Sequence, residues 1–326
     1  MILVAYGTRP EWIKLEKLVN KLKEDNEVKV LFTGQQKDIG QFEYDESLEI
    51  KDGDNRLNSI VSTILDSDVF EGVSRTIVQG DTATAFAVAL ASFHRQIPIV
   101  HVEAGLRTHD RDNPYPEESY RQMISCMSTH NMCPTTQDAM NLELEKKNGQ
   151  KYVVGNTVID NLPDLDITYD DFVLVTLHRR ENHENMKAWF KEVNNLAKNY
   201  PLLRFVLPLH PNPNVQKHKD ILTDVEVIEP VPYPKMLQLI ANCRMIISDS
   251  GGIQEEASFY KKKVLVCRKT TERQAGLHRN LMLIETPSLL SKAFDVNIKQ
   301  PKLDIDCPFG DGQAHIKIAS ILGELS

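Results

Sequence analysis

Short apolar runs recur along the chain, and each passes into a polar turn followed by a helical pattern. Buried strands that alternate with helices in this way are typical of a parallel, doubly wound sheet. Around residues 155–171 the pattern breaks at an acidic, turn-rich segment, and it then starts again. The runs are MILVAY (1–6), VKVLF (28–32), TIVQ (76–79), IPIVHV (97–102), FVLVTL (172–177), FVLPLH (205–210), RMIISDS (244–250) and KVLVC (263–267). The 326 residues are therefore predicted to form an α/β protein of two Rossmann-like, doubly wound domains, 1–165 and 166–326, that face each other across a central cleft.

The polar turns are the expected ligand sites, because such folds bind ligands at the carboxyl ends of their strands. In the first turn, Thr8 and Glu11 have the spacing of a capping box, and Pro10 suits the start of a helix. The helix N-terminus and Arg9 would then attract an anion such as a phosphate. A capped surface helix with a solvated arginine fits these residues equally well.

A second turn of this kind follows the run at 244–250. The glycines Gly251 and Gly252 allow a diphosphate to approach the backbone, and Ser250 can donate from its hydroxyl group. Glu256, one helical turn further on, can accept hydrogen bonds from a ribose. The alternative is a tight turn that binds no ligand.

Acidic side chains also stand at strand ends. Asp81 and Glu103 follow apolar runs, and Glu117 lies in a proline-rich loop. Three carboxylates in one crevice would raise one another's pKa and suit proton transfer, although a single acid at such a place is usually a helix cap. His178 is expected to bind a phosphate or move a proton, with a half-buried structural histidine as the alternative. His101 lies inside an apolar run and is expected to be structural.

Other classes of function find little support in the composition. The net charge of −8 disfavours a nucleic-acid partner. The five cysteines include no C-x-x-C pair and no metal-like spacing of ligands occurs, so buried thiols and no metal site are expected. The first apolar run is too short for a signal peptide or a membrane span, so a cytoplasmic protein with no membrane partner is expected.

At these residues the sequence resembles the UDP-N-acetylglucosamine 2-epimerase family, specifically its bacterial non-hydrolysing branch. The matching motifs follow one another over nearly the whole chain, and several are long enough to be specific. They are GTRPEWIK (7–14), TGQ (33–35), QGDT (79–82), HVEAGLRT (101–108), PEE (116–118), GNTVID (155–160), HRREN (178–182), HPNPNV (210–215), DSGGIQEE (249–256), TTER (270–273) and FGDGQA (309–314).

The resemblance implies a GT-B fold in which the C-terminal helix, 314–325, crosses back to the first domain, and it implies a homodimer. The implied reaction interconverts UDP-GlcNAc and UDP-ManNAc. Because the C2 proton of the sugar is not adjacent to a carbonyl group, the family eliminates UDP to give 2-acetamidoglucal and adds UDP back with protonation from the other face. No cofactor is implied, and neither half carries the G-x-G-x-x-G motif of a dinucleotide site.

The same resemblance assigns roles to residues. The acid–base carboxylates are Asp81, Glu103 and Glu117, of which Asp81 and Glu117 would exchange protons with C2 while Glu103 tunes their charge. The residues expected to bind the substrate or lie beside the reacting centre are Arg9, Lys14, His178, Ser250, Gly251, Gly252, Glu256, Arg273 and Met236, the last where relatives often have an aromatic residue near the uracil.

The sequence also departs from the family pattern. Relatives usually have histidine after the TGQ turn, which helps to hold a second, activating UDP-GlcNAc; here Gln35 is followed by Gln36, so allosteric binding stays open. The chain is shorter than typical members, and Gln274-Ala275 replaces the usual Pro-Glu. The alternatives are a hydrolysing epimerase that releases ManNAc and UDP, an epimerase for a modified UDP-sugar, a GT-B glycosyltransferase that uses a UDP-sugar, and an inactive UDP-sugar-binding protein.

Overall fold

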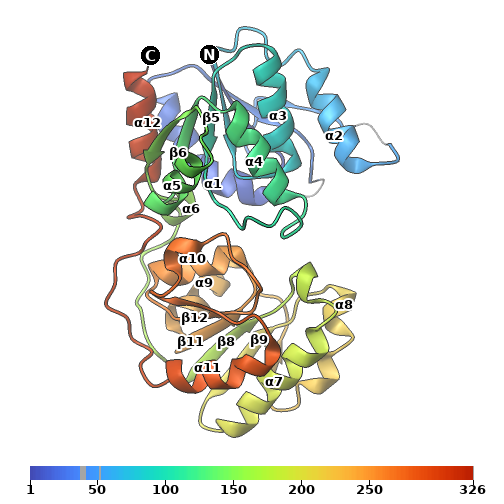
Figure 1. Ribbon diagram of the computed structural model, residues 1–326, viewed down its shortest axis with the longest axis vertical. Coiled ribbons are helices and arrows are strands. Elements are labelled where there is room, and N and C mark those ends of the chain that lie inside the picture. Colours follow the sequence, from blue (N-terminus) through green and yellow to red (C-terminus); the bar gives the residue numbers. More distant parts are fainter. Residues whose placement is uncertain (37–41, 51–52, 326) are drawn as a thin grey trace. The chain divides into compact units, whose positions relative to one another are not determined.

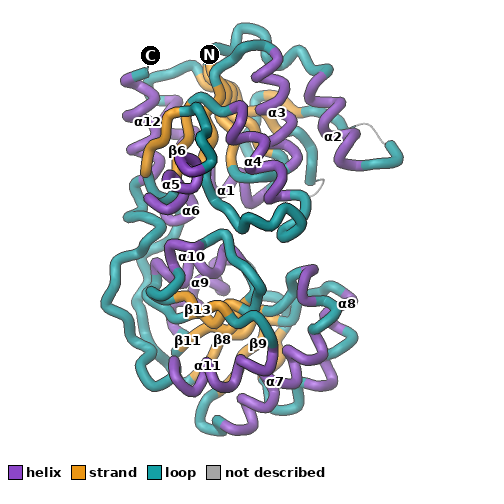
Figure 2. The backbone as a smooth tube through the Cα atoms, in the orientation of Figure 1, coloured by secondary structure: helices purple, strands orange, loops and turns teal. Residues whose placement is uncertain are grey.

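The computed structural model describes residues 1–36, 42–50 and 53–325. The chain divides into two compact units, Met1–Leu162 together with Gly310–Ser326, and Pro163–Phe309. Each unit is a parallel sheet with helices on its faces, drawn as orange strands among purple helices in Figure 2. The predicted α/β class with two doubly wound sheets is therefore confirmed.

Within the described residues, the sheet of the first unit has seven parallel strands in the order β3-β2-β1-β4-β5-β6-β7 (Figure 1). The strands are β1 (Ile2–Tyr6), β2 (Val28–Phe32), β3 (Glu46–Ser47), β4 (Arg75–Gln79), β5 (Ile99–Val102), β6 (His130–Cys133) and β7 (Gln150–Val153). The helices of this unit are α1 (Arg9–Lys23), α2 (Arg56–Leu65), α3 (Ala83–His94), α4 (Glu117–Met127), α5 (Thr136–Leu144), α6 (Thr157–Asp160) and α12 (Ala314–Glu324).

The first strand shows why the apolar runs are continuous. Successive side chains point to opposite faces of the sheet, so Val4 and Tyr6 pack with Trp12 of α1 on one face. Leu3 and Ala5 pack into the other core cluster, which contains residues of α2, α3 and α4. Because helices cover both faces, neither face of the strand carries polar side chains.

Apolar runs do not reveal every strand. Residues His130 to Cys133 form β6 although the first half of this strand is polar. The fully buried Asn131 accepts a hydrogen bond from the Ser128 hydroxyl (2.8 Å) and donates to the carbonyl oxygen of Gln150 (3.4 Å). A polar residue is tolerated inside this sheet because its hydrogen bonds are satisfied, and this depends on tertiary contacts.

The C-terminal helix α12 packs in the first unit, where it lies beside α1 (Figure 1). Its side chains Ile318 and Leu322 belong to the same core cluster as the apolar face of α1. The carboxylate of Asp160 accepts hydrogen bonds from the backbone N–H groups of Ala314 (2.9 Å) and His315 (2.7 Å). Asp160 thus satisfies two N–H groups at the start of this helix.

In the second unit, the described residues form six parallel strands in the order β10-β9-β8-β11-β12-β13. The strands are β8 (Phe172–Thr176), β9 (Arg204–Pro208), β10 (Glu226–Ile228), β11 (Met245–Ser248), β12 (Val264–Val266) and β13 (Leu281–Leu283). The helices are α7 (Met186–Asn199), α8 (Pro213–Gln216), α9 (Tyr233–Asn242), α10 (Gly251–Phe259) and α11 (Leu290–Asn297), with short 3₁₀ helices η1 (Arg180–Asn182), η2 (Lys219–Ile221), η3 (Gln274–Gly276) and η4 (Pro287–Leu289).

The acidic segment before β8 packs onto the second unit. The N–H group of Thr168 donates to the carbonyl oxygen of Ala241 (3.2 Å). The buried ammonium group of Lys262 donates to the carbonyl oxygens of Thr168 and of Cys243, and it lies 3.7 Å from the centre of the Tyr169 ring. Burial lowers the pKa of Lys262 to about 8. These contacts hold this part of the expected linker in place.

Both sheets reverse their strand order at the centre, between β1 and β4 in the first unit and between β8 and β11 in the second. At such a switch point neighbouring strands lead to opposite faces of the sheet, which leaves a crevice at their carboxyl ends. The turns that begin at Gly7, Gly80, Leu177 and Asp249 follow these central strands. The fold therefore places the predicted motifs where doubly wound proteins bind ligands.

Two further expectations concern cysteines and membranes. Cys133, Cys243 and Cys267 are buried, but Cys126 on α4 is exposed and Cys307 is partly exposed, so the expectation of buried thiols is wrong for these two residues. Across the described ranges, no helix combines the length and the apolar character needed to cross a bilayer.

Candidate active site

The turn after β1 is held by a buried carboxylate. Thr8 is the N-cap of α1, but its hydroxyl donates to Oε2 of Glu11 (2.7 Å) and does not cap the helix, so the Thr8 half of the predicted capping box is wrong. Glu11 also accepts from the N–H of Gly7 (3.1 Å) and from the hydroxyl of Thr82 in the turn after β4 (2.6 Å). Burial raises the pKa of Glu11, and the hydrogen bonds from both threonines oppose this rise. Glu11 therefore joins the turns on the two sides of the switch point.

The side chain of Arg9 is exposed at the start of α1, and its guanidinium group has no hydrogen bond within the described residues. Its backbone N–H donates to Oε1 of Gln36 (3.1 Å). Oε1 of Gln35 accepts from the N–H and the hydroxyl of Thr84 (2.9 Å each), and Arg56 donates to the carbonyl oxygen of Gln35 (3.3 Å). The two glutamines thus hold the turn after β2 against its neighbours, while the guanidinium of Arg9 is exposed to solvent.

Glu103 is surrounded by hydrogen-bond donors. Its carboxylate accepts from the ammonium group of Lys14 (2.7 and 2.9 Å), from the amide of Asn156 (2.9 Å) and from the amide of Gln79. The side chain is only 4% exposed, and its backbone has a φ of 66°. An ammonium group and two amides stabilise the ionised carboxylate. Gln79 and Asn156 lie in sequence motifs but were not predicted as site residues.

Asp81 also has a cationic partner. Its carboxylate forms an ion pair with Arg121 of α4, and Arg121 also pairs with the buried Glu118 (3.1 Å). Glu117, the first residue of α4, lies one helical turn before Arg121. The structure therefore places the predicted Asp81 and Glu117 near each other at the N-terminal end of α4. Arg121 was not predicted as a site residue, although its spacing from Glu117 was a usable signal.

His101 is fully buried next to this group of carboxylates. Its Nε2 lies 2.7 Å from the carbonyl oxygen of Gly80, to which it can donate as the neutral tautomer. Burial lowers the pKa of His101 to about 4, with Asp81 and Glu103 close enough to oppose the shift. His101 thus holds the backbone of Gly80, the residue before Asp81, in agreement with the structural role predicted for it.

Because the pKa of His101 is lower in the folded chain, only the unfolded chain binds a proton between pH 6.5 and about 4. The free energy of unfolding of the first unit is therefore expected to fall by about 3 kcal/mol between pH 6.5 and pH 4 on account of this residue. His101→Gln, which keeps a donor for Gly80, should lack this part of the pH dependence. Denaturant unfolding at several pH values measures the difference, and parallel pH curves for the two proteins would contradict the expectation.

His178 follows β8 and stacks on the ring of His210, with 5.0 Å between ring centres and 14° between ring planes. Its side chain is 32% exposed, and Nδ1 lies 3.7 Å from the carboxylate of Asp249. Burial lowers the pKa of His178; the negative charge of Asp249 opposes the shift, whereas His210, Arg179 and His183 reinforce it. The ring is thus partly accessible and close to a buried anion.

The turn from β11 into α10 has the features of an anion site. Ser250 is the N-cap of α10, yet within the described residues its hydroxyl makes no capping bond. A Cβ atom on Gly252 would meet nothing within 4 Å, whereas one on Gly251 would lie 2.9 Å from Nη1 of Arg273. A side chain at Gly251 would force the guanidinium of Arg273 to shift, whereas the space above Gly252 is open at the start of α10, where a helix exposes its first N–H groups.

The predicted ribose and uracil positions lie on neighbouring helices. The buried carboxylate of Glu256 on α10 accepts a hydrogen bond from the hydroxyl of Tyr233 on α9 (2.8 Å). Burial raises the pKa of Tyr233, and the negative charge of Glu256 adds to the rise. Met236 is half-buried one turn further along α9. Tyr233 was not predicted as a site residue.

Arg273 packs against Gly251 in the turn between β11 and α10. Its guanidinium group pairs with Glu272 and, at 3.3 Å, with the fully buried Glu255. Glu272 also pairs with Arg268 (3.0 Å), whose guanidinium reaches Glu181 after β8 (2.6 Å). This buried ionic network links the turns after β8, β11 and β12, a long-range arrangement that the motif spacing does not encode.

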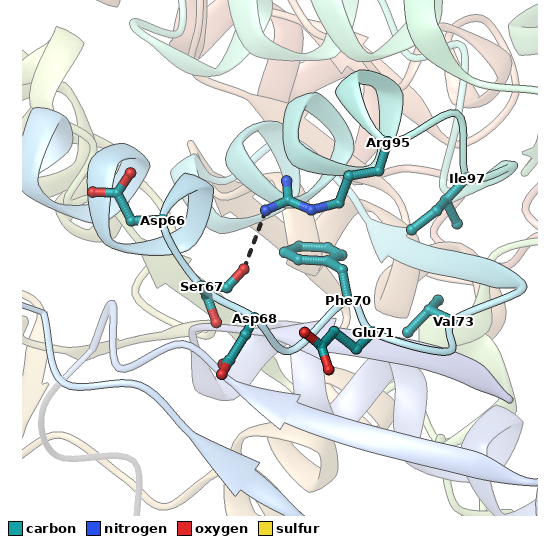
Figure 3. A pocket seen from close by; sticks show the side chains of 8 residues that line it. All are labelled: Asp66, Ser67, Asp68, Phe70, Glu71, Val73, Arg95 and Ile97. Atoms are coloured by element: carbon teal, nitrogen blue, oxygen red, sulfur yellow. Dashed lines mark hydrogen bonds between the residues drawn. The ribbon is translucent and has the colours of Figure 1, made fainter.

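A cavity away from these residues lies in the first unit. It has a volume of about 550 Å³ and adjoins the segments that enter β4 and β5, so it is at the opposite ends of these strands from Asp81 and Glu103. Figure 3 shows Arg95 above the ring of Phe70, 4.7 Å from its centre. The lining residues are Asp66, Ser67, Asp68, Phe70, Glu71, Val73, Arg95 and Ile97. No group of three or more His, Cys, Asp or Glu side chains in the described residues is arranged to hold a metal ion.

Comparison with known proteins places the chain in a family. The sequence model of the family described as UDP-N-acetylglucosamine 2-epimerase matches residues 20–323. The UDP-N-acetylglucosamine 2-epimerase of Neisseria meningitidis is 36% identical over 359 aligned residues, which cover 96% of each chain. The alignment exceeds the 326 residues of this chain, so the relative contains segments that this chain lacks.

Solved structures agree with this assignment. The UDP-GlcNAc 2-epimerase from Neisseria meningitidis bound to UDP-GlcNAc has a TM-score of 0.84 and 34% identity, with 99% of each chain covered. Staphylococcus aureus MnaA in a co-structure with UDP has a TM-score of 0.87 and 32% identity, covering 99% of this chain and 96% of that one. The two Rossmann-like units are accordingly those of a GT-B fold, as predicted. The chain belongs to the UDP-N-acetylglucosamine 2-epimerase family.

Proposed function

We propose that this protein interconverts UDP-GlcNAc and UDP-ManNAc without hydrolysis, by elimination and re-addition of UDP. The observation that carries the proposal is the pair of switch-point sites: carboxylates with cationic partners in the first unit, and an uncapped helix N-terminus beside His178 in the second. Relatives with 36% and 34% identity bear the name of this activity. The substrate's UDP moiety is assigned to the second unit and the chemistry at C2 to the first.

In the forward reaction a carboxylate removes the C2 proton, and its electron pair forms the C1–C2 double bond. The bond between C1 and the diphosphate oxygen breaks, so UDP leaves with its electron pair as 2-acetamidoglucal forms. Asp81 and Glu117 are assigned to proton transfer on the two faces of the sugar. Glu103, which accepts from Lys14 and two amides, is assigned to tuning their charge. Return of a proton to the opposite face and re-addition of UDP give the epimer.

The leaving diphosphate requires positive charge. In the second unit the N-terminus of α10, the hydroxyl of Ser250 and His178 are assigned to it. In the first unit the exposed guanidinium of Arg9 is assigned to the reacting sugar. Glu256, with Tyr233 on one oxygen, is assigned to the ribose hydroxyls, and Met236 lies one turn from Tyr233 for the base. Arg273 is assigned a supporting role behind Gly251.

Incubation with UDP-GlcNAc in D2O, followed by NMR, tests the proposal. We expect deuterium at C2 together with UDP-ManNAc, because elimination exposes this position to exchange with solvent. Free ManNAc as the main product would instead identify a hydrolysing epimerase. Absence of exchange at C2 would contradict the epimerase mechanism and leave a UDP-sugar transferase or a binding protein.

The open space at Gly252 gives a sharper test of the diphosphate site. Gly252→Ala is expected to weaken UDP binding by about tenfold or more, because the new methyl group occupies the approach of the diphosphate to the backbone. The fold should be unaffected, since the methyl group meets no protein atom. Calorimetric titration with UDP measures the effect. Gly323→Ala in α12, where a Cβ also meets nothing within 4 Å, is the matched control and should leave UDP affinity unchanged.

We also propose that the protein is a homodimer and functions in the cytoplasm. A groove of about 380 Å³ between α2, α3 and α4 is lined by Leu57, Asn58, Val61, Ser62, Leu65, Phe86 and Tyr120. Phe93 and Met123, on the same faces of α3 and α4 as Phe86 and Tyr120, are exposed and extend this apolar surface.

The five free cysteines suit a reducing compartment.

Sedimentation equilibrium tests the dimer. Phe93→Asp is expected to convert the dimer into a monomer, because a charge would be buried in an apolar interface. Leu202→Asp, a comparable change at an exposed leucine of the second unit, should leave the mass unchanged. A monomeric wild-type protein would contradict the dimer but not the catalytic assignment.

A further inference from the structure

Asp249 is a fully buried carboxylate that the proposed chemistry does not use. It follows β11 directly and precedes Ser250 and Gly251 at the start of α10. An isolated carboxylate is costly to bury, so its hydrogen-bond partners show what it does.

Within the described residues, the hydrogen-bond donors to this carboxylate come from the connection that follows β8. It accepts from the backbone N–H groups of His178 (3.0 and 3.1 Å) and Arg179 (2.9 Å) and from the side-chain amide of Asn182 (2.9 Å). Nδ1 of His178 lies 3.7 Å from the same carboxylate. The carboxylate of Asp249 thus fixes the peptide groups before and after His178.

Asn182 extends the contact to a third strand end. Besides donating to Asp249, its amide donates to the carbonyl oxygen of Cys267 after β12 (2.8 Å), and its oxygen accepts from Nε1 of Trp189 (3.1 Å). All its polar atoms are therefore engaged, and the side chain is buried. A network satisfied in this way can hold one geometry.

The two strands are also joined just before this point. The hydroxyls of Thr176 and Ser248 lie 2.7 Å apart at the paired ends of β8 and β11, and the N–H of Asp249 donates to the carbonyl oxygen of Thr176 (3.2 Å). The strand ends are held together by these bonds, but they do not reach the ring of His178. In the part of the chain that the structure describes, the hydrogen bonds between His178 and the segment that opens α10 go to the carboxylate of Asp249.

We infer that Asp249 is a positioning residue for substrate binding, which holds His178 in register with the diphosphate-binding turn at Ser250. The inference rests on the proposed function, because it takes that turn and His178 as parts of one UDP-binding site. Asp249 itself need not touch the substrate: its side chain is buried, and its bonds run to the backbone and side chain of the neighbouring turn.

The test uses Asp249→Asn in the full chain. Asparagine keeps the shape but loses the charge, and its NH₂ group faces the N–H donors of His178 and Arg179. We expect kcat/KM to fall by about 100-fold, mainly through a higher KM, and UDP binding measured by calorimetry to weaken in parallel. Asp171→Asn is the control, since Asp171 is an exposed aspartate just before β8 and should give wild-type values.

A second readout separates positioning from general support of the fold. Among the described residues, the titratable groups that act on His178 are Asp249, His210, Arg179 and His183, of which Asp249 is the acidic one. Loss of that charge should lower the pKa of His178 further, which NMR titration of the ring detects. Asn182→Ala keeps the charge but removes one donor, so it should weaken UDP binding while changing the titration of His178 less than Asp249→Asn does.

The titration and UDP binding do not require epimerase activity, so they report on Asp249 even if the proposed reaction is wrong. A folded Asp249→Asn protein with unchanged UDP affinity or an unchanged titration of His178 would overturn the inference. If that variant does not fold, Asn182→Ala decides, and wild-type UDP affinity in it would count against the positioning role.

Discussion

Replacement of Asp81 by asparagine is expected to lower turnover by about 100-fold or more, because one acid–base group commonly contributes 10²- to 10⁴-fold to a rate. Asparagine has nearly the same shape but cannot exchange a proton with C2. Arg121 retains its pairing with Glu118, so the N-terminal part of α4 should stay in place. UDP affinity should be unchanged, since the UDP-binding residues are assigned to the second unit.

Turnover is measured from the rate of deuterium incorporation at C2 in D2O, and UDP binding by calorimetry. Asp66→Asn makes the same change at an exposed C-cap residue of α2 and should behave as the wild type. Full activity of Asp81→Asn would exclude Asp81 from proton transfer. A joint loss of UDP binding and fold would instead give Asp81 a structural role through Arg121.

Replacement of Lys14 by methionine is expected to abolish activity and to lower the free energy of unfolding of the first unit by about 3–5 kcal/mol, because it leaves the carboxylate of Glu103 buried without its cation. The double variant Lys14→Met/Glu103→Gln should regain most of this stability, since no uncompensated charge remains. It should stay inactive, because the charge that Glu103 contributes beside the reacting carboxylates is lost.

The two tryptophans permit a clean measurement. Trp12 lies in the core of the first unit and Trp189 in that of the second, so in a Trp189→Phe background the fluorescence change on denaturation reports on the first unit alone. Lys21→Met, which removes an exposed ion pair with Glu24, the C-cap residue of α1, is the control and should change stability by less than about 1 kcal/mol. Equal destabilisation by the single and the double variant would show that the charge of Glu103 is not the cause.

The predictions that succeeded rest on local patterns. Continuous apolar runs such as MILVAY predicted the central strands because helices cover both faces of each sheet. Strand ends were predicted to within a residue or two, since the polar turn that follows each run is visible in the sequence. Polar strands such as β6 were not predicted from apolar runs. Asn131 can be buried there because other residues of the fold satisfy its hydrogen bonds.

The partners of the site residues were not predictable from the same patterns. Lys14 and Glu103 are 89 residues apart, and Asn156 and Glu103 are 53 apart. Nothing in the spacing of either motif says that an ammonium group and two amides will converge on one carboxylate. Thr8 shows that a local pattern can also mislead. Its spacing from Glu11 predicted a capping box, but its hydroxyl donates to Glu11 and does not cap the helix.

The sequence by itself determined the fold class, the order of the elements and the positions of the chemically active side chains at strand ends. These features follow from periodicity and turn chemistry within a few neighbouring residues, whereas the resemblance to the family rested on the motifs themselves. The tertiary structure alone decided which charges are paired: Arg121 with Asp81, Lys14 with Glu103, and Asp249 with the turn that carries His178. The physical reason is that a buried charge is stabilised by whichever donors the fold brings within hydrogen-bonding distance, and folding selects these donors without regard to their separation along the chain.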